Sequence, residues 1–222
     1  MRSDQNLTFS FKDFFRTKEV NWTRPEDGTS HSGHERNHLF LNSEGRQFSD
    51  ISGVSGLDSD GDGRAFAILD FDRDGWPDLA LVNANAPLLQ LFRNRMAEFA
   101  EDVRPAAMIA IRFVGGNASP APSAEWSNRD GYGALVTVEL DETMSLVREH
   151  RCGEGMGAQN SATLLVGIGD RKATGRLTVR WPSGVVQELP SVPAGSLVTV
   201  HENPADSPAG TPFVVHRYGT RP

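Results

Sequence analysis

The 222-residue chain has little of three things that would define other protein classes: cysteine, basic charge and long apolar runs. Cys152 is the only cysteine, which excludes an intramolecular disulfide and a zinc site built on several thiolates. Lys and Arg number 22 against 29 Asp and Glu, and the net charge of −7 argues against nucleic acid or an anionic membrane surface as the main partner. Because the chain has no stretch of about 18 apolar residues, we expect no membrane-spanning helix.

Amphipathic helices of twelve or more residues are also missing from the pattern. Short apolar runs, separated by Gly, Pro, Asn and Asp, take their place and predict an all-β chain. Polar and apolar side chains alternate most clearly over 136–140 and 176–181. Further short runs lie at 107–113, 164–168, 185–189 and 197–200. We therefore predict a sandwich or barrel of strands in this half of the chain.

Composition divides the chain into four zones. We expect a polar N-terminal segment over 1–37, a repeat region with a dense acidic loop over 38–104, a β domain over 105–201, and a loose Pro- and Gly-rich tail over 202–222. The second zone holds a faint internal repeat, in which Asn42 and Phe48 are matched by Asn94 and Phe99 about 52 residues later.

The strongest chemical signal is the segment 70–78, which reads DFDRDGWPD. Alternate side chains of a tight loop converge on its concave side, Gly75 permits a sharp turn, and the carbonyl of Trp76 can point inward. Calcium takes about six to eight hard oxygen ligands, and massed carboxylates without a cation would repel one another. The sequence predicts a calcium site, with a solvated acidic turn as the alternative. Its predicted ligands are Asp70, Asp72, Asp74, Trp76 and Asp78.

The loop is not an EF-hand, because Leu81 stands where that motif needs a bidentate Glu. Residues 65–69 and 79–82 look like strands, so the site is of the strand–loop–strand kind. The earlier segment 58–63 looks like a second copy but lacks a late carboxylate. We expect it to be a Gly-rich polar turn rather than an independent site.

Two adjacent modules in this chain resemble known ones. The acidic loop between strands, preceded by Gly61-Asp62-Gly63-Arg64, is similar to the FG-GAP or VCBS repeat of β-propeller blades. Residues 122–200 resemble the ASPIC/UnbV domain. The matching residues are Asn128-Arg129-Asp130, Gly133-Ala134, Gln159-Asn160-Ser161, Gly167-Ile168-Gly169 and Trp181-Pro182-Ser183-Gly184.

The resemblance implies a protein similar to cartilage acidic protein and its bacterial relatives. These carry several repeats in a propeller followed by the domain, and they are generally extracytoplasmic, calcium-binding proteins with inferred adhesion or ligand-binding roles. No catalytic residue is carried over by the resemblance. Some relatives sit in enediyne biosynthesis loci, which leaves a biosynthetic role open.

The chain departs from that pattern because a propeller needs about four to eight blades and this sequence offers one or two. A lone blade exposes its faces and edges, so we expect it to pack on the ASPIC/UnbV-like domain or on another chain. A fragment of a longer protein is the other reading. The polar N-terminus, which does not look like a signal peptide, fits it.

Three other groups are weighed as sites. His31, His34 and His38 suggest a transition-metal site or a solvated loop. Cys152, near basic neighbours, suggests a reactive thiol or an inert one. Arg129 suggests a contact to a carboxylate or sugar ligand, or an ion pair within the protein. For aromatic residues that suit sugar stacking, the candidates are Trp126, Tyr132 and Trp181, of which Trp181 is expected in the core.

We predict an all-β, calcium-stabilised protein in which one or two β-propeller-type repeats pack with a C-terminal β-sandwich-like domain. The predicted function is non-catalytic binding or adhesion toward an unidentified protein or carbohydrate. One alternative is an enzyme or biosynthetic accessory protein that uses Cys152, the histidines or Arg129. Another is an assembly module that completes a propeller with a partner chain.

Overall fold

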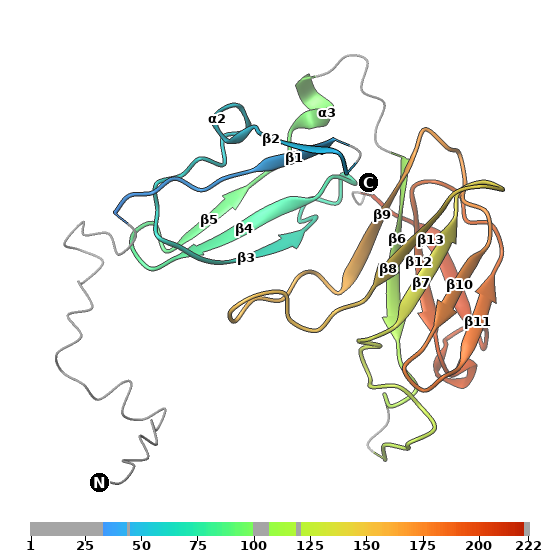
Figure 1. Ribbon diagram of the computed structural model, residues 1–222. Coiled ribbons are helices and arrows are strands. Elements are labelled where there is room, and N and C mark those ends of the chain that lie inside the picture. The colour runs from blue at the N-terminus through green and yellow to red at the C-terminus, as the bar shows by residue number, and fades with distance from the viewer. Residues whose placement is uncertain (1–32, 44, 100–106, 119–120, 220–222) are drawn as a thin grey trace, which may run out of the picture. The chain divides into compact units, whose positions relative to one another are not determined.

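The computed structural model describes residues 33–43, 45–99, 107–118 and 121–219 (Figure 1). The chain divides into two compact units, Met1–Asp62 with Ala84–Leu88, and Gly63–Asn83 with Leu89–Pro222. Most of the predicted N-terminal segment, residues 1–32, lies outside the described residues. Regular structure in the described part is almost all β, with only single-turn helices beside it, which confirms that the fold is all-β as predicted.

The first unit contains a hairpin followed by one helical turn. Strands β1 (Phe40–Ser43) and β2 (Gln47–Asp50) pair antiparallel, and α2 (Ser52–Ser55) follows. Asp50 accepts a hydrogen bond from the Ser52 N–H at 2.9 Å and another from its hydroxyl, and His38 Nδ1 lies 3.0 Å from its second oxygen. These bonds, first the one from the Ser52 hydroxyl, lower the pKa of Asp50 to about 2.

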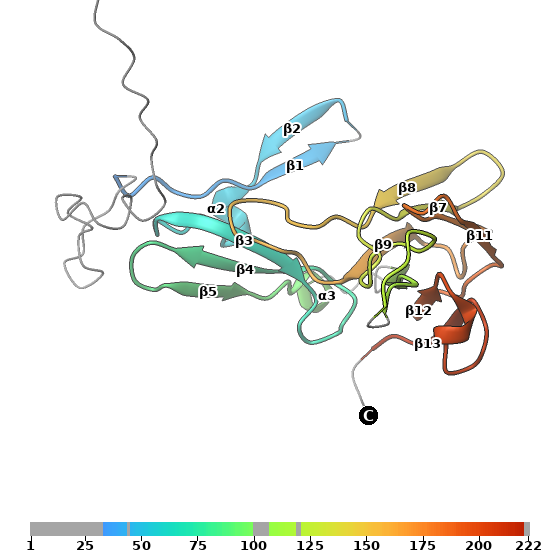
Figure 2. The ribbon, with the colours of Figure 1, turned by 90° about the horizontal axis from the view of Figure 1, so that it is seen from below.

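The second unit begins with a three-stranded antiparallel sheet. Its order is β3 (Gly63–Leu69), β4 (Asp78–Asn83), β5 (Leu89–Phe92), and α3 (Met96–Phe99) follows it. Register pairs Leu69 with Asp78, so the acidic loop closes the β3–β4 hairpin (Figure 2). The strand–loop–strand context predicted for this loop is therefore present.

Two four-stranded sheets make up the rest of this unit. One has the order β11-β10-β7-β8 and the other the order β13-β12-β6-β9, and every pair is antiparallel except β6 with β12. A 3₁₀ turn, η2 (Pro204–Asp206), lies between β12 and β13. The strand bounds are β6 Ala107–Val114, β7 Leu135–Glu139, β8 Ser145–Glu149, β9 Thr163–Gly169, β10 Leu177–Arg180, β11 Val186–Leu189, β12 Ser196–His201 and β13 Phe213–Arg217.

The buried side chains of both sheets form one hydrophobic cluster, as in a β-sandwich. Alternation puts Val136 and Val138 of β7 and Val198 and Val200 of β12 at 0% exposure. Trp181 is 2% exposed and packs edge-on against Phe113, which confirms its predicted place in the core. The described residues form neither a closed barrel nor a propeller.

The loose tail expected over 202–222 differs most from the structure. Residues 213–217 form β13, which pairs antiparallel with β12 over five positions. The Tyr218 N–H then donates to the Gly195 carbonyl at 2.7 Å. The sequence analysis expected a loose tail because Pro and Gly are frequent there and the only apolar run, Phe213-Val214-Val215, is short. That run suffices for a strand because β12 offers it an unpaired edge.

Candidate metal site

The acidic loop folds around the side chain of Asp70. The two oxygens of this carboxylate accept hydrogen bonds from the N–H groups of Asp74 and Gly75, at 3.2 and 2.9 Å. Gly75 has φ +94° and Arg73 has φ +59°, so two left-handed residues tighten the turn. The predicted requirement for glycine at position 75 is met by this backbone.

Asp78 joins the loop to the chain that follows β5. This carboxylate is 3% exposed and accepts from the Phe71 N–H at 3.0 Å and the Asn94 N–H at 2.8 Å. Asn94 Nδ2 also donates to the Pro77 carbonyl at 3.3 Å. A buried carboxylate held by two backbone donors is oriented before any ligand arrives.

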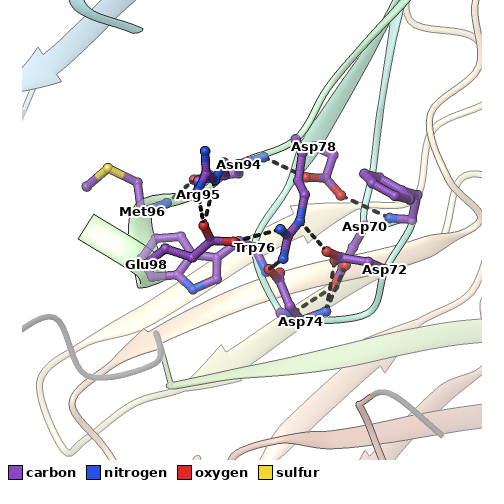
Figure 3. Close-up of polar contacts among 12 residues, drawn as sticks. Asp70, Asp72, Asp74, Trp76, Asp78, Asn94, Arg95, Met96 and Glu98 are labelled. Atoms are coloured by element: carbon purple, nitrogen blue, oxygen red, sulfur yellow. Dashed lines mark hydrogen bonds and ion pairs between the residues drawn. The ribbon is translucent and has the colours of Figure 1, made fainter. Parts of the chain in front are cut away.

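Three of the predicted ligands come together. One oxygen from each of Asp70, Asp72 and Asp78 lies within 4.8 Å of the other two (Figure 3). Among the described residues this is the one such group of His, Cys, Asp or Glu. Calcium–oxygen distances are about 2.3–2.6 Å, so oxygens bound to one ion lie within about 5 Å of each other. The spacing and the all-oxygen donor set fit that ion.

Asp74 and Trp76 stand apart from this group. Asp74 Oδ1 accepts from the Trp76 N–H at 2.8 Å, and its other oxygen lies 3.7 Å from Arg93 Nη2. Burial raises the pKa of the Asp74 carboxyl, and repulsion from Asp72, Asp70 and Asp78 adds to the rise. That Asp74 and the Trp76 carbonyl are ligands stays a prediction.

The guanidinium group of Arg93 pairs with carboxylates of this loop. Its Nε donates to Asp72 Oδ2 at 2.6 Å, and its Nη1 donates to Glu98 Oε1 at 2.6 Å. The bond to Asp72 raises the pKa of Arg93. Arg95 also pairs with Glu98, and Arg73 lies within the loop itself. The four loop carboxylates and Glu98 still outnumber these three guanidinium groups, so the site keeps an excess of negative charge. Asn94 belongs to the internal repeat seen in the sequence, but nothing in that repeat linked Asn94 or Arg93 to the acidic loop.

Tyr218, from the segment after β13, also contacts the loop. Its hydroxyl donates to Asp70 Oδ2 at 2.9 Å, and burial raises the pKa of the phenol. The two residues are 148 positions apart, and Tyr218 lies in the predicted tail. No local sequence signal could have found this contact, because it depends on how β13 is placed.

The second acidic segment, 58–63, is engaged within its own unit. Asp58 forms an ion pair with Arg36 at 3.0 Å. The Asp62 N–H donates to Asn85 Oδ1 at 3.0 Å, and its carbonyl accepts from the Ala84 N–H at 2.9 Å. These contacts are those of a structural turn.

The other candidates are described only in part or have structural contacts. His31 lies outside the described residues, and His38 is bound to Asp50. Cys152 is exposed. Arg129 forms an exposed ion pair with neighbouring Asp130 at 3.0 Å, as the alternative of an ion pair within the protein predicted.

His150, two residues before Cys152, is 4% exposed and belongs to the packed interior. Its ring stacks between Phe113 and Tyr132, and its Nε2 lies 3.1 Å from the Asp130 carbonyl. Burial lowers the pKa of His150, so the ring is neutral at pH 7. Tyr132, weighed as a sugar-stacking residue, has its ring against His150.

A deeply buried charge that the sequence analysis missed is the carboxylate of Glu202. Glu202 is 1% exposed. Its Oε2 accepts from the N–H groups of Gly116 and Ser127 at 2.8 Å, and its Oε1 accepts from the hydroxyls of Ser127 at 2.8 Å and Ser183 at 2.5 Å. The carboxylate therefore ties two loops to the end of β12. The sequence shows only an acid after an apolar run.

Part of the Gln-Asn-Ser motif lies against the free edge of β3. Asn160 Oδ1 accepts from the Ile68 N–H at 2.8 Å, and the Ser161 N–H donates to the Ile68 carbonyl at 2.9 Å. These two bonds satisfy an edge-strand residue that a three-stranded sheet would leave unpaired.

Comparison with known proteins supports one of the two modules. The model of the family described as ASPIC and UnbV matches residues 124–207, a stretch that runs from before β7 through η2. The chain is thus an all-β protein with an ASPIC/UnbV domain, and the resemblance predicted for that domain is confirmed. No curated protein matches the chain. None of the described helices combines the length and the apolar character that a membrane crossing requires.

Proposed function

We propose that this protein binds calcium at the β3–β4 loop and that the ion orders this loop for a non-catalytic binding or adhesion role. The observation that carries the proposal is the convergence of one oxygen each from Asp70, Asp72 and Asp78 within 4.8 Å. In this proposal the three-stranded sheet is an FG-GAP or VCBS-type repeat, and the protein is a relative of cartilage acidic protein. The sheet and its strand–loop–strand site support that reading.

The ion would act by neutralising charge. Asp70, Asp72 and Asp78 would hold it, and backbone N–H groups already orient Asp70 and Asp78 for the task. Extracellular calcium modules bind with dissociation constants of about 10⁻⁴–10⁻³ M. At one hundred times the dissociation constant, binding adds about 2.7 kcal/mol to the free energy of unfolding. By neutralising the carboxylates, the ion would therefore order the loop and add to the stability of the fold.

Calorimetric titration of chelator-treated protein tests this proposal. The expected result is one saturable calcium site, at least tenfold weaker in Asp72→Asn. The matched control is Asp60→Asn, in the other acidic segment, which is expected to leave the affinity unchanged. Absence of binding up to 10 mM calcium, or equal loss in both variants, would reject the loop as the site.

A second candidate function, an assembly module, is favoured by the faces of the three-stranded sheet. Leu89 and Leu91 of β5 are 65% and 51% exposed and share one face with Val82, which pairs with Leu89 across the strands. Phe66 and Ile68 of β3 are 50% and 41% exposed and lie on the opposite face. A propeller blade buries both faces against its neighbours, so this sheet could join such a partner.

Sedimentation velocity with Leu89→Lys and Leu91→Lys together tests assembly. The candidate predicts a concentration-dependent oligomer in the wild type and a monomer in the double variant. A wild type that stays monomeric across micromolar to millimolar concentrations would contradict self-assembly through this face.

A further inference from the structure

The acidic loop and the segment after β13 belong to a closed ring of contacts within the second unit. The Tyr218 hydroxyl donates to Asp70 Oδ2 at 2.9 Å, and the Tyr218 N–H donates to the Gly195 carbonyl at 2.7 Å. The Gly195 N–H donates in turn to the Met108 carbonyl of β6, also at 2.7 Å. The Met108 side chain lies beside Gly75, and a Cβ on that glycine would stand 3.5 Å from Met108 Cγ. The Gly75 N–H donates to Asp70 Oδ2 at 2.9 Å and closes the ring.

The strand β13 lies at the edge of its sheet and is held there with little burial. Its five residues are half-buried or exposed, whereas β6, β9 and β12 each supply buried residues to the core. Its pairing with β12 ends at the Tyr218 N–H on one side and, on the other, at a 2.8 Å bond from the His201 N–H to the Pro212 carbonyl. Edge strands with few buried apolar contacts open locally at a smaller cost than the whole fold. The bond from Tyr218 to Asp70 therefore adds to the few contacts that keep β13 paired.

The same bond acts on the acidic loop. Asp70 Oδ2 accepts from two donors, the Tyr218 hydroxyl and the Gly75 N–H, so the rotation of this carboxylate is restricted. In this orientation one Asp70 oxygen lies within 4.8 Å of oxygens of Asp72 and Asp78. A docked Tyr218 therefore favours the arrangement that a cation needs. Linkage makes the effect reciprocal, because the factor by which the docked segment raises the affinity for a cation is the factor by which the bound cation favours docking.

We propose that cation binding at the acidic loop fixes β13 against β12 through Tyr218, an inference that rests on the calcium site proposed above. The loop and the strand then form one cooperative unit, although 148 positions separate Asp70 from Tyr218. With the cation bound, both are ordered. Without it, β13 leaves the edge of β12 more often, so the calcium concentration sets how often that edge is uncovered. Tyr218 is a positioning residue for the ion and not one of its ligands.

Amide hydrogen exchange of the full chain, followed by NMR in chelator and at saturating calcium, tests this coupling. The Tyr218 and His201 N–H groups report on the two ends of β13. The His150 N–H, which donates to the Ala134 carbonyl at 2.9 Å beside the edge strand β8, reports on opening elsewhere. Calcium is expected to slow exchange at Tyr218 and His201 about fivefold more than at His150. Equal slowing at all three amides would overturn the proposal, because the ion would then stabilise the fold as a whole.

Tyr218→Phe assigns the coupling to the hydroxyl, because it keeps the ring and removes only the donor to Asp70. In this variant the amide at position 218 should exchange faster in chelator than in the wild type, and calcium should no longer protect it selectively. Tyr132→Phe is the matched control and should keep the selective protection. Selective protection that survives in Tyr218→Phe would overturn the proposal.

Calorimetry on the same samples separates a failure of this coupling from a failure of the calcium site. Calcium that binds to the wild type without selective protection of β13 would overturn the coupling and leave the site in place. Absence of calcium binding would reject the site itself, and the coupling with it.

Discussion

Arg93 and a calcium ion would act on the same carboxylates. The guanidinium lies 2.6 Å from Asp72 Oδ2 and 3.7 Å from Asp74 Oδ2, so it satisfies the loop in the absence of an ion and repels a cation that approaches it. Arg93→Gln should therefore bind calcium several-fold more tightly than the wild type. In chelator, the same variant should melt at a lower temperature.

Arg93→Gln is a sharp test because its calcium affinity should rise while its melting temperature in chelator falls. Calorimetry measures the first change and thermal unfolding the second. Arg64→Gln, on β3, is the control variant and should change the calcium affinity far less, because Arg64 forms its hydrogen bond to the Gly63 carbonyl. Calcium binding that weakens when Arg93 is removed would mean that the guanidinium organises the site instead of competing for it.

Glu202 stabilises the domain through its hydrogen bonds more than through its charge. Ala in its place leaves the N–H groups of Gly116 and Ser127 without acceptors, and it should lower the free energy of unfolding by about 3 kcal/mol. Gln can keep its oxygen on those two donors and turn its NH₂ toward the hydroxyls of Ser127 and Ser183. Glu202→Gln should lose only about 1 kcal/mol.

Urea denaturation of the two variants distinguishes the contribution of the hydrogen bonds from that of the negative charge, provided that the denaturant slope stays unchanged. A Gln variant as unstable as the Ala variant would contradict the hydrogen-bond account, because it would assign the stability to the negative charge.

Asp141 contributes stability that is lost at acid pH. Hydrogen bonds, first from the Thr143 N–H and then from Arg171, lower the pKa of this carboxyl to about 2. A depressed pKa stabilises the fold above the unfolded value of about 3.9, and that stability is lost as pH falls toward 2. The difference in stability between wild type and Asp141→Asn should be largest near neutral pH and shrink between pH 4 and 2.

This prediction is measured by urea denaturation at a series of pH values, with the carboxyl resonance of Asp141 followed in parallel. A difference between the two proteins that stays constant from pH 7 to pH 2 would contradict the lowered pKa.

At the scale of single elements, β13 shows what local patterns can and cannot reveal. The alternating runs at 136–140 and 176–181 predicted β7 and β10, because a strand with one buried face leaves a period of two in the sequence. The strand at 213–217 leaves only three apolar residues in a polar context. Its formation depends on the open edge of β12, which the tail's own sequence does not encode.

In the candidate site, too, some features follow from local sequence and others depend on distant segments. The carboxylates at 70, 72 and 78 and the left-handed Gly75 follow from spacing within nine residues. The contacts of Arg93 and Tyr218 with the loop join distant segments, and they arise only once β5 and β13 are in place. Local sequence therefore predicted the three carboxylates that converge, but not the distant side chains that pair with them.

Tyr218 lets the contribution of the segment after β13 be measured at the loop. Tyr218→Phe removes the hydroxyl that donates to Asp70 Oδ2, and it should cost about 1 kcal/mol of stability and weaken calcium binding several-fold. Tyr132→Phe is the matched control, because Tyr132 contributes its ring to the stack on His150. If the two variants have the same calcium affinity, the Tyr218 contact does not orient Asp70.

At the scale of the whole molecule, a confirmed ASPIC/UnbV domain accompanies a single three-stranded sheet that exposes apolar side chains on both faces. Asn160 and Ser161 hold one edge of that sheet, at Ile68 of β3. The domain thus supplies hydrogen bonds that a neighbouring strand would otherwise make. Binding of the sheet by a further partner is then a matter of its faces rather than of this edge.

The central claim is that a cation sits in the loop between β3 and β4, and terbium luminescence tests it most directly. Terbium takes calcium sites, and the indole of Trp76, which belongs to the loop, can sensitise its emission. We predict saturable emission that calcium displaces, that Trp76→Phe largely removes, and that Asp72→Asn shifts to at least tenfold higher terbium. Emission that is unchanged in both variants, or that calcium does not displace, would contradict the account.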